Sequence, residues 1–170
     1  MSQDKDTPKV KFRPDFSPTV TWPVIFEQLQ EDGPAREWKI PMRWHRPTQK
    51  DCDDFRKRQE RAAQARIEYL QAAQKDAEKA VKDGATAIDF DAVSAGAEAA
   101  SLDVFNPDAE LARWWKGWPR DAIEGDLDPD SDADRASLLD MRGMRAAMHE
   151  ALQMLMAGAR QKNWQTPPGR

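Results

Sequence analysis

The side chains in this sequence best suited to nucleophilic, acid–base or zinc-dependent chemistry are two histidines and one cysteine. His45 and His149 lie in distant parts of the chain, and together with Cys52 they show none of the spacings of a zinc-binding motif. Cys52 opens a predicted helix, whose dipole would lower the pKa of its thiol, but the aspartates on both sides of it oppose that effect. We therefore expect surface or core histidines, an unreactive cysteine, no metal and no catalytic residue.

An acidic run over residues 126–134 has carboxylates at alternate positions, like the start of a calcium-binding EF-hand loop. Measured from Asp126, however, Ser131 stands where that loop requires glycine, and Ser137 stands where it requires the closing glutamate. We interpret the run as a solvated linker whose last carboxylates favour the N-terminus of a following helix. The glycines are scattered and form no phosphate-binding loop, so we expect no cofactor and no enzyme.

The composition favours a single soluble domain in the cytoplasm. The chain has 170 residues, 39% of them hydrophobic, and its formal net charge of −4 argues against bulk binding of nucleic acid. The sequence contains no run of about 20 apolar residues that could cross a membrane and no secretion signal. Seven tryptophans lie towards the two ends of the chain, so we expect these ends to supply most of the packing.

Two segments near the N-terminus have the pattern of a β-hairpin, which we assign to residues 19–47. Residues 19–26 are mostly β-branched and aromatic, and Pro23 among them indicates an edge strand or a bulge. Residues 37–46 alternate between apolar and polar side chains, as in a half-buried strand. Because an isolated hairpin is only marginally stable in water, we expect helices over its apolar face and therefore an α+β fold.

The remainder of the chain is predicted to be mainly helical. Thr48 and Asp51 have the spacing of a capping box, and good helix formers continue from there to a possible glycine terminus at Gly84. Beyond Leu70 the apolar stripe of this helix is almost all alanine, so its distal half should project or pack closely on a partner. We expect one α+β domain over residues 19–164, preceded by a flexible arm (1–18) and followed by a tail (165–170). Within the domain we expect the hairpin (19–47), a long helix (48–83), short helices with a Trp-rich turn (85–125), an acidic linker (126–134) and a C-terminal helix (135–163).

The aromatic and sulfur-containing side chains form the pattern that most suggests a function. Methionine is flexible, so the methionines of the closing helix suit either an irregular core or an adaptable peptide-binding surface. We interpret the tryptophan-rich hairpin and turn and this helix as a surface that holds another polypeptide. The predicted partner-binding residues are Trp22, Trp38, Met42, Trp44, Trp114, Trp115, Trp118, Met144, Met148, Leu152, Leu155 and Met156.

A series of short motifs resembles the tail assembly chaperones of long-tailed bacteriophages, over residues 19–58, 111–125 and 138–163. The first three motifs are an aromatic-Pro-Val strand core (21–24), a Gly turn (32–33) and an Arg-x-Thr-Gln helix start (46–49). The last three are a Gly-Trp element (117–118), an acidic-Gly turn (124–125) and a basic-Asn helix end (162–163). Residues 62–105 match no part of this pattern, and Pro119 and Arg120 replace the hydrophobic residues that usually follow the Gly-Trp element.

The resemblance implies a protein of the bacterial host cytoplasm that binds the tape measure protein. It would keep this long apolar rod soluble while subunits of the tail tube protein polymerise around it, and it would be absent from the finished virion. A homo-oligomer is compatible with the sequence. The alternative is a structural head–tail connector or minor tail protein that stays in the particle. A third class is a small regulator that uses the basic stretch at residues 56–66 on nucleic acid, although interleaved acids there favour a salt-bridged solvent face.

Overall fold

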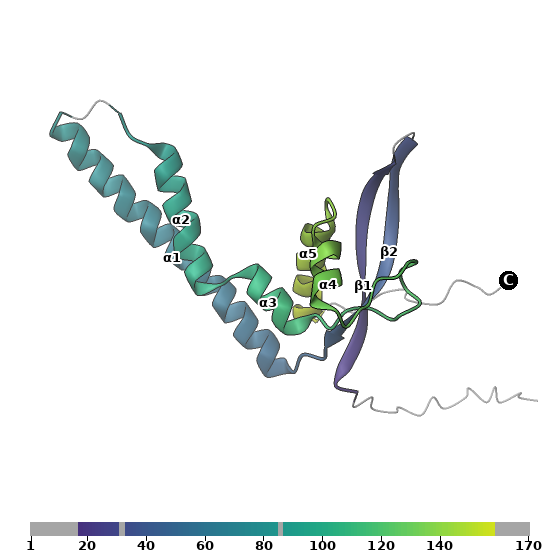
Figure 1. Cartoon of the computed structure of the whole chain (residues 1–170). Coiled ribbons are helices and arrows are strands. Elements are labelled where there is room, and N and C mark those ends of the chain that lie inside the picture. Colours follow the sequence, from purple (N-terminus) through teal and green to yellow (C-terminus); the bar gives the residue numbers. More distant parts are fainter. Residues whose placement is uncertain (1–16, 31–32, 85–86, 159–170) are drawn as a thin grey trace, which may run out of the picture.

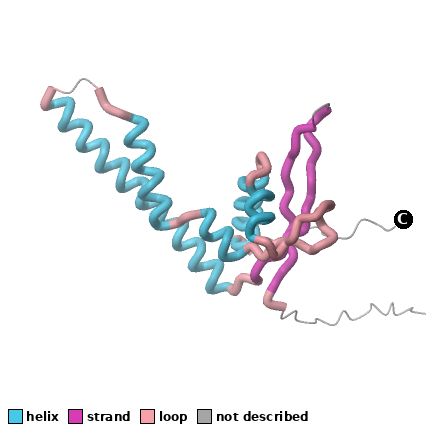
Figure 2. Tube along the Cα trace, viewed as in Figure 1, coloured by secondary structure: helices cyan, strands magenta, loops and turns pink. Residues whose placement is uncertain are grey.

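The computed structural model describes residues 17–30, 33–84 and 87–158. Within them the chain is an α+β protein, with an N-terminal antiparallel hairpin and a mainly helical remainder. Figures 1 and 2 show two parts. We call the hairpin and the helices beside it the body. We call the distal part of the long helix, from residue 67 onward, and the helix that returns along it the arm, which projects away from the body (Figure 1).

The hairpin consists of β1 (Thr19–Gln30) and β2 (Gly33–His45), paired antiparallel with Val24 opposite Ile40. Opposed residues of an antiparallel pair share a face of the sheet, so the alternation in the sequence collects apolar side chains of both strands on one side. Both strands extend further towards the tip than the sequence predicts, because their pairing continues past an irregularity that follows Gln28.

Two prolines face each other across the hairpin without interrupting it. Pro23 of β1 pairs with Pro41 of β2. Nearby on β2, the backbone of Arg43 bonds outward: its N–H donates to the Gly117 oxygen at 2.8 Å, and its oxygen accepts from the Lys116 N–H at 2.8 Å. Because bonding direction alternates along a strand, Pro41 also occupies an outward-facing position, and neither ring removes a bond between the strands. β1 is an edge strand, as predicted, but the irregularity of the pairing does not fall at Pro23.

The outer edge of β2 is covered by the segment that follows α3 (Pro107–Trp114). Trp115 forms a single antiparallel bridge with Trp44, next to the two backbone bonds of Arg43. These bonds tie the Trp-rich turn to the hairpin, so that the rings of Trp115 and Trp118 become buried there.

The long helix α1 (Gln49–Lys82) begins at the predicted capping box. The Thr48 hydroxyl accepts from the Asp51 N–H at 3.2 Å, and the Asp51 carboxylate accepts from the Thr48 N–H at 2.9 Å. Hydrogen bonds from the Thr48 hydroxyl and then from its N–H hold the pKa of Asp51 below the usual value. The helix ends at Lys82 with Asp83 as its C-cap, and Gly84 follows in the left-handed conformation with a φ of +98°, as at a typical glycine terminus.

The helix α2 (Phe90–Val104), capped by Asp89, returns along α1 and packs on it through small residues. Tyr69 lies so close to Gly96 that a Cβ at that position would overlap the tyrosine ring. Ala97 is the only buried side chain in the described part of the arm. The distal half of α1 therefore packs closely on another helix, as expected, and that helix belongs to the same chain.

The C-terminal helix predicted for residues 135–163 is two helices over the described residues, so the prediction of one continuous helix is wrong. They are α4 (Asp132–Leu139), which begins inside the predicted acidic linker, and α5 (Met144–Met156). Gly143 between them has a φ of +86°, a left-handed conformation that redirects the chain. The end of the predicted helix, from residue 159 onward, lies outside the described residues.

The core of the body forms where the apolar sides of the hairpin, α3 and α5 meet the first turns of α1. Its largest fully buried side chains are tryptophans and methionines. The buried members of this cluster are Val24, Phe26, Met42, Trp44, Phe55, Leu111, Trp114, Trp115, Trp118, Leu138, Met144, Ala147, Met148, Ala151, Leu152, Leu155 and Met156.

Candidate protein-binding groove

Most of the predicted partner-binding residues lie in the core of the body. Only Trp22 and Trp38 are partly exposed, and they pack against the same cluster. The buried ones are Met42, Trp44, Trp114, Trp115, Trp118, Met144, Met148, Leu152, Leu155 and Met156. The expectation of an exposed surface lined by these residues is therefore not met. The apolar sides of the hairpin and of α5 cover each other, which removes large aromatic and sulfur-containing side chains from water.

Contacts among the tryptophans show that they stabilise the body. Trp115 and Trp118 are stacked with ring centroids 5.9 Å apart, and Trp115 Nε1 donates to the Gly117 oxygen at 2.9 Å. Trp44 Nε1 donates to the Trp22 oxygen at 3.2 Å. These bonds satisfy two indole donors that would otherwise be buried at a cost in free energy. One bond lies within the hairpin and the other within the Trp-rich turn, while the backbone bonds of Arg43 join the two.

The titratable side chains considered for catalysis lie in three different surroundings. His149 Nε2 lies 2.9 Å from Asp108 Oδ1, and Arg145 Nη1 lies 2.8 Å from Asp108 Oδ2, so both join α5 to α3. Burial and then Lys116 lower the pKa of His45. Burial raises the pKa of the Cys52 thiol, and the flanking carboxylates add to that rise. Within the described ranges, no group of three or more His, Cys, Asp or Glu side chains could hold a metal ion.

The acidic run borders a polar hollow beside the base of the hairpin. Arg43 Nη2 lies 3.3 Å from Asp130 Oδ1, and Arg120 Nη2 lies 3.5 Å from Asp128 Oδ1. These carboxylates therefore face arginines of the same chain. The hollow has a volume of about 410 Å³ and is lined by Pro18, Thr19, Arg43, His45, Lys116, Asp130 and Arg135.

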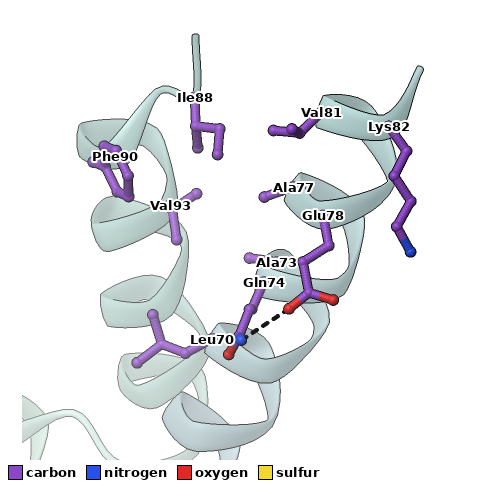
Figure 3. Close-up of a pocket in the computed structure, with 10 residues that line it drawn as sticks. All are labelled: Leu70, Ala73, Gln74, Ala77, Glu78, Val81, Lys82, Ile88, Phe90 and Val93. Carbon is purple, nitrogen blue, oxygen red and sulfur yellow. Dashed lines mark hydrogen bonds between the residues drawn. The ribbon is translucent and has the colours of Figure 1, made fainter. Parts of the chain in front are cut away.

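An open apolar groove of about 700 Å³ lies at the far end of the arm, between α1 and the start of α2. Figure 3 shows Ala77 and Val81 of one wall and Ile88 and Val93 of the other directed toward the space between the helices, while Phe90 lies at the outer side of α2. One wall is formed by α1, and the other by the N-terminal part of α2 and the residues just before it. The lining residues are Leu70, Ala73, Gln74, Ala77, Glu78, Val81, Lys82, Ile88, Phe90 and Val93.

The groove exists because the side chains that face the gap are too small to fill it. Ala73 and Ala77 line the α1 wall, and an alanine side chain reaches only one carbon from the backbone. On the side of the groove nearer the body, the Tyr69 ring lies between the two helices against Gly96 and keeps their backbones apart. Small residues therefore leave an open channel at the tip, where larger ones would have closed the contact between the helices.

Large apolar side chains of the groove remain exposed to solvent. Phe90 is 73% exposed, Val81 55% and Leu70 41%. On the α1 wall the polar border includes a hydrogen bond from Gln74 Nε2 to Glu78 Oε1 at 3.0 Å (Figure 3). A contiguous exposed apolar patch with a polar border is typical of a surface that binds another molecule.

The sequence interpretation missed this groove and placed binding on the tryptophan and methionine side chains. Leu70 and Val81 are spaced to fall on one side of a helix, which is a detectable signal, but alanines separate them. The opposite wall, from Ile88 to Val93, comes from a different helix. Only the packing of the two helices brings these residues together.

No family model, curated protein or solved structure matches this chain. None of the helices in the described ranges combines the length and the apolar character needed to cross a membrane. The groove is the feature of the described chain that bears most directly on function.

Proposed function

We propose that this protein is a tail assembly chaperone of a long-tailed bacteriophage. It acts in the cytoplasm of the bacterial host, where it binds the tape measure protein and keeps it soluble while tail tube subunits polymerise around it. It catalyses no reaction and needs no cofactor. The observation that carries the proposal is the open apolar groove of the arm, and the ordered motifs that resemble the family support it.

The dimensions of the groove suit a helical segment of a client protein. Its α1 wall runs from Leu70 to Val81, which at 1.5 Å per residue is about 16 Å, or about three turns of a helix. A groove of this kind accepts an amphipathic helix through apolar side chains spaced three, four and seven residues apart. Docking would cover the exposed parts of Phe90 and Val81. Burial of a fully exposed side chain of this kind contributes about 1.5–3 kcal/mol, and each of these two would gain part of that.

The division into body and arm suits a chaperone. The tryptophan and methionine core of the body is complete without a partner, so client binding need not be coupled to folding of the body. The arm projects from the body (Figure 1), which leaves space around the groove for a client much longer than the groove itself.

The proposal is tested by expressing the tape measure protein of the same phage with and without this chain. We expect the client to be soluble only in the presence of this chain. The variants Phe90→Ser and Val81→Ser should reduce the soluble fraction severalfold, because they remove apolar surface from the groove. Ile25→Ser is the matched control, since Ile25 is 49% exposed and lies on the hairpin, away from the groove.

A client whose solubility is unaffected by this chain would refute the proposal. Mass spectrometry of purified virions separates the chaperone from the structural alternative, a head–tail connector or minor tail protein. A chaperone should be absent, whereas a stoichiometric amount of this chain in the particle would identify it as a structural component.

A further inference from the structure

The two sides of the arm differ in charge. On α1, the groove is bordered by Glu78 and Lys82, whose charges offset one another. The other side has no positive charge to offset its acids, because no lysine or arginine occurs from residue 87 to residue 112. The acidic residues of that stretch are Asp89, Asp91, Glu98, Asp103, Asp108 and Glu110.

Acidic side chains of this stretch form ion pairs near the body, but Asp91 and Glu98 on the arm form none among the described residues. Glu110 Oε1 lies 2.8 Å from Arg58 Nη2, and Asp108 contacts Arg145 and His149. On α2, by contrast, Asp91 and Glu98 are exposed and take part in no ion pair with any residue that the structure describes.

In the sequence, the groove residue Phe90 stands between two carboxylates, Asp89 and Asp91. Asp89 uses its side chain to accept a hydrogen bond from the Ala92 N–H, and Asp91 is exposed in the first turn. Both can stabilise the N-terminus of α2, but such stabilisation requires only one carboxylate at the cap. A ligand resting on Phe90 would therefore lie within the negative potential of this wall.

We propose that the groove selects a basic amphipathic helix: a client segment with an apolar stripe and lysines or arginines along the flank that faces α2. This inference rests on the proposed function, because it specifies the client segment that the chaperone binds. The apolar stripe enters between α1 and α2, and the basic flank lies along Asp89 and Asp91. Charge complementarity of this kind fixes the orientation of the helix and raises its association rate.

The inference is tested with two synthetic helical peptides of about 18 residues, long enough to be helical when bound. Both carry the same leucine and alanine stripe, but one is flanked by lysines and the other by glutamates. We expect the full-length protein to bind the lysine peptide about tenfold more tightly at low salt, since only its lysines can form ion pairs with the carboxylates of α2. The preference should shrink in about 1 M salt, where the Debye length is about 3 Å.

Two matched charge variants locate the preference. Asp89→Asn with Asp91→Asn should reduce it to about twofold, and asparagine at residue 89 still caps the helix. Asp103→Asn is the control, because it removes a charge from the far end of α2 and should leave the preference nearly unchanged. Fluorescence anisotropy gives the affinities of each protein for both peptides.

The outcomes separate the two proposals. If Phe90→Ser weakens binding of both peptides but the lysine peptide is never preferred, the groove binds helices and the charge inference is wrong. If neither peptide binds, the charge inference is wrong, and the client solubility assay alone then decides the chaperone role. A dimer that forms through the groove and is abolished by Phe90→Ser would show that a second copy occupies it, which also overturns the inference.

Discussion

The body and the arm are built from the same chain by opposite uses of side-chain size. In the body, Trp44, Trp118 and Met148 are fully buried and fill the space between the hairpin and α5. In the arm, two helices meet through alanines and Gly96, while the large apolar side chain of Phe90 points to solvent. The body is thus stabilised by a filled core, whereas small side chains in the arm leave an open groove with exposed apolar surface.

This difference shows that large apolar residues indicate a binding surface only where the fold leaves them exposed. Tryptophan and methionine are frequent in both cores and interfaces, so their presence in the sequence fits either role. On this chain they serve the core. The less conspicuous residues of the arm, Leu70, Val81 and Phe90, form the accessible apolar surface.

The largest expected contrast compares one aromatic truncation in each part. Trp118→Ala should destabilise the protein by about 3–5 kcal/mol, because it opens a cavity in a filled core. Phe90→Ala should change the free energy of unfolding by at most about 0.5 kcal/mol, because the side chain is already mostly in water. Urea denaturation measures both, and equal losses would contradict the division into a packed body and an open arm.

A smaller effect concerns the contact between Tyr69 and Gly96, which sets the distance between α1 and α2 in the arm. Gly96→Ala should destabilise the protein by about 1 kcal/mol, because the new Cβ meets the Tyr69 ring. In a Tyr69→Ala background the same change should instead stabilise α2 by about 1 kcal/mol, since alanine is the better helix former. A double-mutant cycle measures this reversal. Additive effects would show that the Tyr69 ring does not separate the helices.

A last effect, of similar size, tests how α1 begins in the body. Thr48→Ala should cost about 1 kcal/mol at about pH 7 and should raise the pKa of Asp51, whereas Thr48→Ser should retain both properties. Since the folded pKa of Asp51 is lowered, its contribution is present above the unfolded value of about 4 and is lost as the pH falls through the folded value. NMR titration gives the pKa, and an unchanged value in Thr48→Ala would contradict this account.

Local patterns predicted most of the elements. Alternation from Trp38 to Trp44 predicted a strand, and the capping pair Thr48 and Asp51 predicted the start of α1, because both signals depend only on neighbouring residues. The break between α4 and α5 was missed, since the apolar spacing continues across Gly143 while its left-handed backbone changes the direction of the chain. A glycine within a periodic segment permits such a turn but does not require it.

The groove could not be predicted in the same way, because it depends on how two helices pack. The sequence shows that α1 beyond Leu70 is rich in alanine, which predicts either a projecting helix or a close contact. Whether that contact is closed or leaves a channel depends on how α2 is positioned along α1. In the structure Gly96 faces Tyr69, and Phe90 therefore lies at the far end of the arm. No short segment of the sequence contains that information.

Pro23 offers no N–H at the outer edge of β1, and Pro41 offers none at the outer edge of β2. An extended peptide that tried to add a strand to either side would meet a gap in the row of donors. On the β2 side it would also find the backbone of Arg43 already bonded to the Trp-rich turn. Edges interrupted in this way resist sheet-to-sheet aggregation. The hairpin is thereby protected from recruitment into β-aggregates, even where unfolded chains are abundant.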